Sequence, residues 1–171
     1  MDAYLAVASK REVREYADRP LDPDAERRIL EAGRVAGSSK NRQARRFVVV
    51  RDDGVREEVA SSVYDGDTVR GAALVVAIVV GPKGPTAFDA GRAAQNMMLA
   101  ASNDGIGSCP NGVADAERMR AALGHGEHEK VAIVLAFGYP AKPRRDPQAL
   151  AADEWLARAD RRPLEEIVQE L

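Results

Sequence analysis

Residues Ala72 to Val80 constrain the fold most, because they read AALVVAIVV without a polar interruption. A strand with one exposed face alternates apolar and polar side chains, so this β-branched run predicts a strand buried on both faces. The run is far too short to span a bilayer, which takes about 20 apolar residues in a helix. Phe47 to Val50 and Lys130 to Phe137 predict further strands, and the segment GIGSCPNGV predicts a glycine-rich strand or turn.

Helical patterns surround these predicted strands. Asp22 is a good N-cap with Pro23 at the first helical position, and this helix is expected to stop near Gly37. Residues 86–103 predict a helix that is apolar nearly all round, as in a large core or a subunit interface. Further helices are expected at residues 3–8, 52–62, 114–123 and 149–158, and a short amphipathic one that needs a partner surface at 164–171. Helices around a few strands indicate a single layered α+β domain over residues 1–171.

Composition narrows the classes of function. The chain has 171 residues, which fits one domain, and its net charge of −2 gives no sign of a nucleic-acid or membrane-surface partner. The one cysteine, Cys109, forms no internal disulfide, and the N-terminal apolar stretch is too short for a signal peptide, so we expect a cytoplasmic protein. We interpret Cys109 as a buried structural thiol. His125 and His128 are interpreted as exposed loop residues, because no cluster of metal ligands supports a metal site.

Two basic segments suit a phosphate group. Lys10, Arg11 and Arg14 place three cations within five residues, and arginine forms bidentate bonds to phosphate while lysine adds a point charge. Arg161 and Arg162 precede the expected terminal helix and are suited to complete such a site. Each segment also has an ordinary explanation, a solvated loop paired with nearby glutamates in the first case and surface charge beside a helix in the second.

Two further segments suit a flat ligand. The polar run Gly37 to Gln43 offers hydroxyl, amide and backbone donors to the edge of a heteroaromatic ring, although a surface turn has the same composition. The glycines between Gly105 and Gly112 let backbone approach a flat ligand closely, although a tight strand connection explains them equally well. No phosphate-binding P-loop, dinucleotide fingerprint or nucleophile elbow is present in the sequence.

In chain order, five segments resemble the FMN-dependent nitroreductase family along nearly the whole chain. KREVREY is similar to the family's opening Arg-Arg-Ser-x-Arg-x-Phe, which holds the FMN phosphate. AGSSKNRQARRFVVV is similar to Ala-Pro-Ser-x-x-Asn-x-Gln-Pro-Trp-x-Phe, which borders the isoalloxazine from the partner subunit. FDAGRAAQNMMLAASNDGIGSC resembles the long dimer helix with its Gly-x-Gly strand. VAIVLAFGYP resembles the strand that ends in Gly-Tyr-Pro, and RRPLEEIV the terminal segment that returns a basic residue to the phosphate.

The resemblance implies a three-layer sandwich, with a mixed, mostly antiparallel sheet surrounded by helices, in an intertwined homodimer. It implies ping-pong hydride transfer from NAD(P)H through FMN N5 to a small acceptor such as a nitroaromatic or a quinone, without a catalytic side chain or a metal. The implied ligands are Lys10, Arg11, Arg14 and Arg161 or Arg162 at the phosphate, Ser38, Ser39, Asn41 and Gln43 at the ring or ribityl chain, and Asn111 and Gly112 beside N5.

The chain departs from the family pattern at several places. Glu12 stands where the family usually has Ser, Gly37 where it has Pro, and Ala44-Arg45 where it has Pro-Trp. A carboxylate near a phosphate is unfavourable unless it pairs with arginine or points away. The alternatives are therefore a flavin-binding protein without turnover, a dehalogenase or flavin-cleaving member of the same superfamily, and a deazaflavin in place of FMN.

Overall fold

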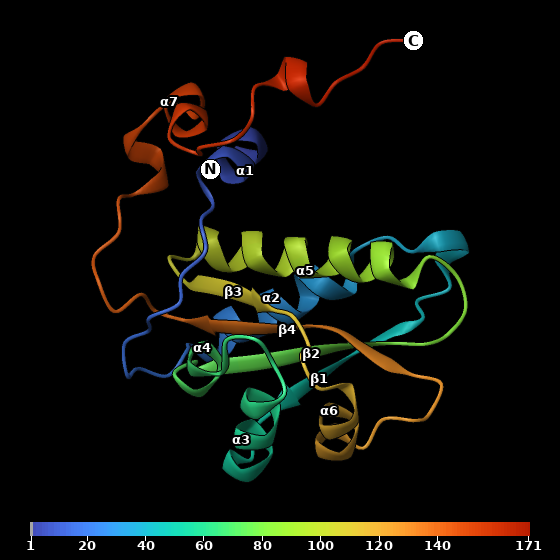
Figure 1. Cartoon of the computed structure of the whole chain (residues 1–171). Helices are drawn as coiled ribbons and strands as arrows, with labels where there is room; N and C mark the ends of the chain where they lie inside the picture. The colour runs from blue at the N-terminus through green and yellow to red at the C-terminus, as the bar shows by residue number, and fades with distance from the viewer. Residues whose placement is uncertain (1) are drawn as a thin grey trace. The chain divides into compact units, whose positions relative to one another are not determined.

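The computed structural model describes residues 2–171, which form two compact units (Figure 1). The core unit comprises residues 11–144. The terminal unit combines residues 2–10 with residues 145–171. The core unit holds the sheet and most of the helices.

A four-stranded sheet runs through the core unit in the order β1-β2-β4-β3, with β1 at Arg45–Val50, β2 at Leu74–Val80, β3 at Gly107–Asn111 and β4 at Lys130–Gly138. Every neighbouring pair is antiparallel, so the sheet of the described residues is wholly antiparallel, where the resemblance implied a mixed one. All side chains of the central strand β2 are buried. The prediction of a strand buried on both faces is confirmed.

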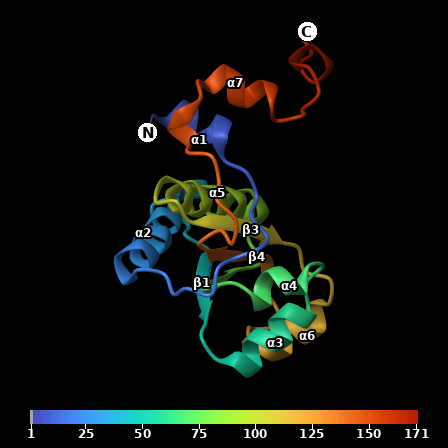
Figure 2. The same ribbon diagram turned by 90° about the vertical axis from the view of Figure 1, so that its left-hand side faces the viewer.

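Helices cover both faces of the sheet (Figure 2). On one face lie α2 (Pro23–Arg34) and α5 (Thr86–Asn103), and on the other lie α3 (Asp53–Ser61), α4 (Gly66–Arg70) and α6 (Ala116–Leu123). Leu74, Val76 and Ile78 of β2 join the core under α2 and α5, whereas Val75 and Ala77 join the core on the opposite face. This alternation follows from the pleat of a strand. The core unit is therefore a three-layer sandwich of the α+β class, as expected.

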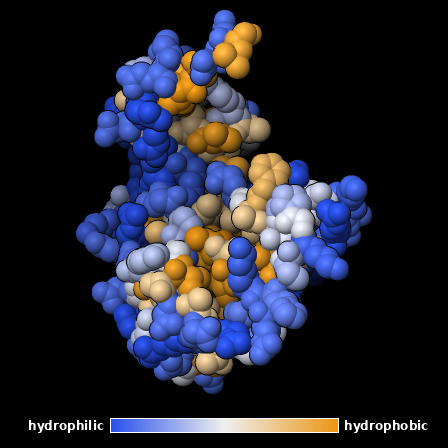
Figure 3. Space-filling model, turned by 45° about the vertical axis from the view of Figure 1, so that its right-hand side comes forward, coloured by the Kyte–Doolittle hydropathy of each residue, from blue (hydrophilic) through white to orange (hydrophobic). Residues whose placement is uncertain are grey.

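One side of α5 is buried and the other is open in the single chain. Met97 packs against α2 so closely that a Cβ at Gly33 would lie 2.7 Å from the Met97 sulfur, which explains the glycine. On the other side Phe88 is 67% exposed, and Gly91 and Arg92 are exposed beside it. Figure 3 shows apolar side chains reaching the surface between charged ones. The all-round apolar pattern of this helix thus reflects one buried face and one face with no covering in a single copy.

Helix α2 begins at Pro23 as predicted and ends at Arg34. It was expected to continue to near Gly37. The Arg45 side chain donates hydrogen bonds to the carbonyl oxygens of Gly33, Arg34 and Ala36, so its guanidinium satisfies the last carbonyls of the helix. The sequence gives no local sign of this cap, because Arg45 belongs to strand β1.

The terminal unit contains α1 (Ala3–Ser9), a 3-10 turn at Pro147–Ala149, α7 (Ala152–Ala157) and a 3-10 turn at Leu164–Glu166. Trp155 of α7 is buried, and its indole N–H donates to the carbonyl oxygen of Pro147 at 2.9 Å. The amphipathic helix predicted for residues 164–171 is wrong, because only the 3-10 turn forms and its residues are exposed. So short a helix does not repay its nucleation cost unless a surface packs against it.

The structure tests two smaller predictions, for Cys109 and for the two histidines. Cys109 is buried, as predicted. The prediction that His125 is exposed is wrong, because its ring is buried with Nδ1 3.3 Å from the Gly126 carbonyl oxygen, whereas His128 is exposed. Between residues 2 and 171, no three His, Cys, Asp or Glu side chains gather as metal ligands would. Over the same range, no helix combines the length and apolarity needed to cross a bilayer.

Candidate functional site

The basic segment Arg11–Arg14 lies along the outer edge of β3. Val13 donates its backbone N–H to the Ser108 carbonyl oxygen at 3.0 Å. The buried Val13 side chain packs on Gly107, where an added Cβ would lie only 2.6 Å from it. Because side chains alternate along an extended segment, the neighbouring Glu12 and Arg14 side chains are exposed. The sheet edge therefore fixes the backbone from which the charged side chains project.

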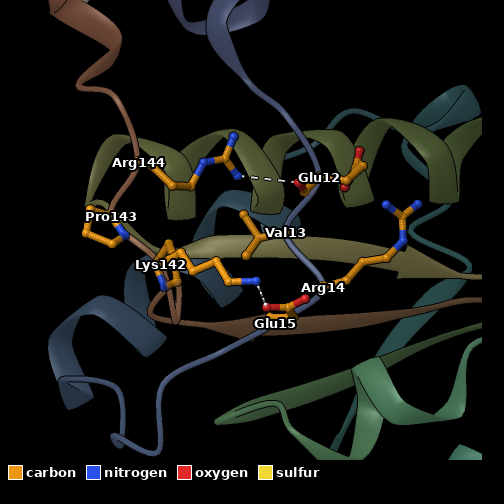
Figure 4. Close-up of a pocket in the computed structure, with 8 residues that line it drawn as sticks. Glu12, Val13, Arg14, Glu15, Lys142, Pro143 and Arg144 are labelled. Carbon is orange, nitrogen blue, oxygen red and sulfur yellow. Dashed lines mark hydrogen bonds and ion pairs between the residues drawn. The ribbon is translucent and has the colours of Figure 1, made fainter.

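A groove of about 370 Å³ opens beside this segment (Figure 4). It is lined by Glu12, Val13, Arg14, Glu15, Pro140, Lys142, Pro143 and Arg144. The Lys142 ammonium lies 2.6 Å from the Glu15 carboxylate, and the Arg144 guanidinium donates to the Glu12 carbonyl oxygen at 3.4 Å. The backbone N–H of Ala141 also donates to the Glu15 carbonyl oxygen at 3.0 Å. The groove thus joins two segments that are far apart in the sequence.

Arg14 extends from the groove toward the start of α4. Its Nε lies 3.6 Å from a carboxylate oxygen of Asp65. Asp65 also accepts hydrogen bonds from the hydroxyl and backbone N–H of Thr68, at 2.7 and 3.5 Å, and so caps the helix. The Arg14 side chain is 64% exposed, so this ion pair contributes little and does not prevent the guanidinium from binding another anion.

Tyr16 holds the same segment in place and has a structural role. Its hydroxyl donates to the Ala136 carbonyl oxygen at 3.1 Å, and its ring covers Gly138, where a Cβ would lie 2.7 Å from the ring. Burial raises the pKa of Tyr16, and Cys109 and the nearby carboxylates add smaller contributions of the same sign. The phenol therefore stays protonated and acts as a structural donor.

Asn111 and Gly112 lie where β3 ends. Asn111 is buried, and its side-chain N–H donates to the Cys109 carbonyl oxygen at 3.2 Å, so this amide serves the strand itself. The Gly112 carbonyl oxygen accepts the backbone N–H of Tyr64 at 3.1 Å, and the Tyr64 ring lies over Gly112. The Tyr64 side chain is 81% exposed, which is a large apolar area for a solvent-facing ring. It offers an aromatic face beside Gly112.

The polar loop Ser38–Gln43 is held by side chains at both its ends. The Ser38 hydroxyl oxygen accepts the backbone N–H of Gln43 at 2.9 Å, and the Ser39 hydroxyl oxygen accepts from Arg42 at 3.2 Å. The backbone N–H of Ser39 donates to both carboxylate oxygens of Asp89, at 3.1 and 3.3 Å. Asp89 is buried in the first turn of α5, so the loop is tied to that end of the helix.

Backbone strain marks the same loop. Lys40, Asn41 and Gln43 have φ angles of 52°, 53° and 52°, in the left-handed region. Such a conformation costs a non-glycine residue roughly 1–2 kcal/mol and gathers at functional sites when the surrounding structure enforces it. The Asp89 contact and the Ser38 contact provide that enforcement.

The structure brings some of the predicted site residues together and leaves others apart. Gly112 contacts Tyr64, and the next residue, Asp65, pairs with Arg14, so Arg14 and the end of β3 share one neighbourhood. The loop Ser38–Gln43 lies at the N-terminal end of α5, away from this neighbourhood in the same chain (Figure 1).

The remaining predicted phosphate ligands, Lys10, Arg161 and Arg162, lie in the terminal unit. Arg161 donates there to the carbonyl oxygens of Ala159 and Asp160. The ligand roles of all these residues stay predictions.

Four residues of the candidate site were not found from the sequence. These are Tyr64, Asp89, Lys142 and Arg144. Lys142 and Arg144 stand in a visible Pro- and Arg-containing loop, but nothing in the sequence pairs that loop with Glu15. Asp89 was seen only as a part of the long helix, and Tyr64 carried no pattern at all.

Comparison with known proteins identifies the family of this chain. Residues 2–170 match the protein family described as "Putative TM nitroreductase". The chain belongs to this nitroreductase family. The family resemblance that rested on five short segments is thereby confirmed.

Individual relatives are similar to this chain over most of their length. An Archaeoglobus fulgidus protein named "Putative NADH dehydrogenase/NAD(P)H nitroreductase" is 28% identical over 167 residues, which cover 87% of this chain and 96% of the relative. The crystal structure of a "putative nitroreductase in complex with fmn" from Desulfovibrio desulfuricans is 29% identical with a TM-score of 0.83, covering 100% of this nitroreductase and 98% of that chain. The Vibrio harveyi NADPH:FMN oxidoreductase, whose structure was solved with NAD+, shares the fold at 24% identity and a TM-score of 0.79. The match covers 96% of this chain and 75% of the Vibrio harveyi chain.

Proposed function

We propose that this nitroreductase is an FMN-dependent oxidoreductase that uses NADH or NADPH to reduce a small acceptor such as a nitroaromatic or a quinone. The observation that carries the proposal is the likeness to the Desulfovibrio FMN complex, which spans the whole of this chain. The family match over residues 2–170 further supports the interpretation that both units belong to one nitroreductase domain.

The donors of the core unit fit the phosphate end of FMN. A phosphate monoester needs several charged donors, and Arg11 and Arg14 project from a segment whose backbone is fixed to β3. Glu12 stands in the same segment and is exposed. The family resemblance also predicts Lys10 and either Arg161 or Arg162 as phosphate ligands, and these residues belong to the terminal unit.

The end of β3 fits the ring. We assign backbone groups of Asn111 and Gly112 to the N5 edge, because the Asn111 side chain already bonds within the strand. The exposed Tyr64 ring beside Gly112 offers an apolar surface for a flat heterocycle. Ser38, Ser39, Asn41 and Gln43 would border the ring or the ribityl chain from a second copy of the protein, since they lie away from Arg14 in their own chain.

A homodimer is therefore part of the proposal. The open side of α5, with Phe88 exposed, is the surface that we assign to subunit contact. Burying an aromatic ring of this kind against a second copy removes apolar area from water, which favours association.

When bound, FMN supplies at N5 the atom that takes a hydride from NAD(P)H and passes it to the acceptor, in ping-pong order. The chain's own residues bind the phosphate, orient the ring and restrict water on one ring face. Because the flavin carries the redox chemistry, we assign no catalytic side chain. Tyr16, whose pKa is raised by burial, is not a proton donor in this scheme.

Anaerobic reduction followed by reoxidation tests the proposal. The protein is loaded with FMN, and NADH or NADPH is added while the flavin absorbance is recorded. Loss of the flavin bands, followed by their return when a quinone or a nitroaromatic is added, is the expected result. A protein that binds FMN but never oxidises either nucleotide would instead be a flavin-binding protein without turnover.

A further inference from the structure

We propose that Lys142 and Arg144 form, with Arg14, a phosphate-binding subsite in the groove beside the Arg11–Arg14 segment. The ligand is a phosphate monoester, whose dianion offers three acceptor oxygens to guanidinium and ammonium donors. The choice between FMN and the 2′-phosphate of NADPH as its source rests on the proposed function. The binding of a phosphate ester does not.

The cations lie at the two sides of the groove. Figure 4 shows Lys142 and Arg144 on one side, whereas Arg14 starts from the opposite side and its side chain extends away from both, toward Asp65. Both sides are held by backbone contacts, because the Ala141 N–H donates to the Glu15 carbonyl oxygen and Tyr16 forms an isolated β-bridge with Pro140. The cations therefore project from fixed backbone, which reduces the entropy lost when a ligand binds.

The balance of charge in the groove favours an anion. The groove has three cationic and two acidic side chains among its lining residues, which leaves one excess positive charge. Its volume of about 370 Å³ lies at the lower end of the range for small-molecule sites, roughly 300–1,000 Å³, and suits a phosphorylated fragment.

The present contacts of Lys142 and Arg144 are weak enough for a ligand to replace them. The Lys142 and Glu15 side chains are 80% and 67% exposed, and ion pairs with such exposure are weak. The Arg144 bond to the Glu12 carbonyl oxygen is long, at 3.4 Å. These contacts keep both cations at the groove, and a dianion that reaches two or three of them at once replaces them favourably.

Pairs of ligands that differ only by a phosphate test the subsite. Binding of FMN against riboflavin, and of 2′,5′-ADP against 5′-AMP, is measured calorimetrically on the full chain and on its Lys142→Ala/Arg144→Ala variant. The double variant should lose at least about tenfold in affinity for the phosphorylated member of one pair, as expected when charged hydrogen bonds are removed. Binding of the member without the phosphate should stay within about twofold, because it makes none of these bonds.

Three further variants sharpen the test. Two control variants, Lys130→Ala and Arg118→Ala, each remove an exposed cation away from the groove, the first at the start of β4 and the second in α6. Both should leave the affinities for all four ligands unchanged. Glu15→Gln removes the carboxylate that competes for Lys142, and should tighten binding of the phosphorylated ligand.

Each outcome has a fixed meaning. A loss confined to FMN assigns the subsite to the flavin phosphate, and a loss confined to 2′,5′-ADP assigns it to NADPH. If the double variant changes neither the affinity of FMN relative to riboflavin nor that of 2′,5′-ADP relative to 5′-AMP, the subsite is refuted. If wild-type protein binds no FMN but still discriminates 2′,5′-ADP through these two cations, the proposed flavin function fails while the subsite stands.

Discussion

The backbone N–H of Ser39 donates to both carboxylate oxygens of Asp89, at 3.1 and 3.3 Å, across 50 residues of sequence. This contact ties a loop with three left-handed, non-glycine residues to the first turn of α5. The loop carries the side chains that we assign to the flavin of the partner subunit. A buried carboxylate thus holds the geometry of a surface loop.

Replacing Asp89 should loosen this loop. Asp89→Ala removes a charged acceptor from a backbone N–H and should lower the free energy of unfolding by about 1.5–3 kcal/mol, measured by urea denaturation. Asp89→Asn keeps one acceptor oxygen and should recover most of the loss. The Ala variant should also bind FMN more weakly. The control, Asp115→Ala, removes the cap of α6 and should lower stability without changing FMN affinity.

Arg14→Ala tests the phosphate assignment. The loss of one charged hydrogen bond should weaken FMN binding by about 1.5–3 kcal/mol, measured by fluorescence titration, while riboflavin binding changes little. Arg118→Ala is the matched control, because Arg118 is also an exposed arginine paired with a carboxylate, that of Glu58. Unchanged FMN affinity in the Arg14 variant would remove Arg14 from the site.

Stability should depend on pH through Glu129. The Arg46 guanidinium and the Gly126 N–H hold the pKa of Glu129 at about 2, below its ordinary value of 4.5. Since the folded pKa is the lower one, the contribution is fully present above about pH 4.5 and is lost as the pH falls toward 2. Glu129→Gln and Arg46→Gln should each flatten the dependence of unfolding free energy on pH in this window. An unaltered slope in both variants would show that the pair is not formed in solution.

The proposed dimer is tested at the open side of α5. Light scattering at micromolar concentration should give twice the mass of the 18.4 kDa chain. Phe88→Asp places a charge on that surface and should shift the protein toward monomer, because burying an unpaired charge in an interface is costly. A wild-type monomer would contradict the assignment of Ser38, Ser39, Asn41 and Gln43 to a neighbouring flavin.

The sequence was most informative where one local pattern dominates. The run at Leu74–Val80 is a strand buried on both faces, and its β-branched residues favour a strand over a helix while the lack of polar residues favours burial of both faces. Asp22 and Pro23 placed the start of α2 correctly, because a cap acts within one turn. Residues 86–103 gave both bounds of α5 but not which of its faces stays open.

Prediction failed where distant residues decide the structure. Helix α2 ends early because Arg45 reaches back from β1, and Lys142 joins the site only because β4 returns the chain beside Glu15. The residues near Leu164 have helical spacing, but all of them are exposed, so no packing offsets the cost of starting a helix. Tyr64 belongs to the candidate site only because its ring lies over Gly112, which is distant in the sequence.

The absorbance spectrum of the freshly purified protein, recorded before any ligand is added, is the decisive test of the proposed flavin site. We expect a yellow protein whose flavin bands change when NADH or NADPH is added. A colourless protein that remains unchanged with excess FMN would contradict the flavin site built from Arg11, Arg14, Asn111 and Gly112.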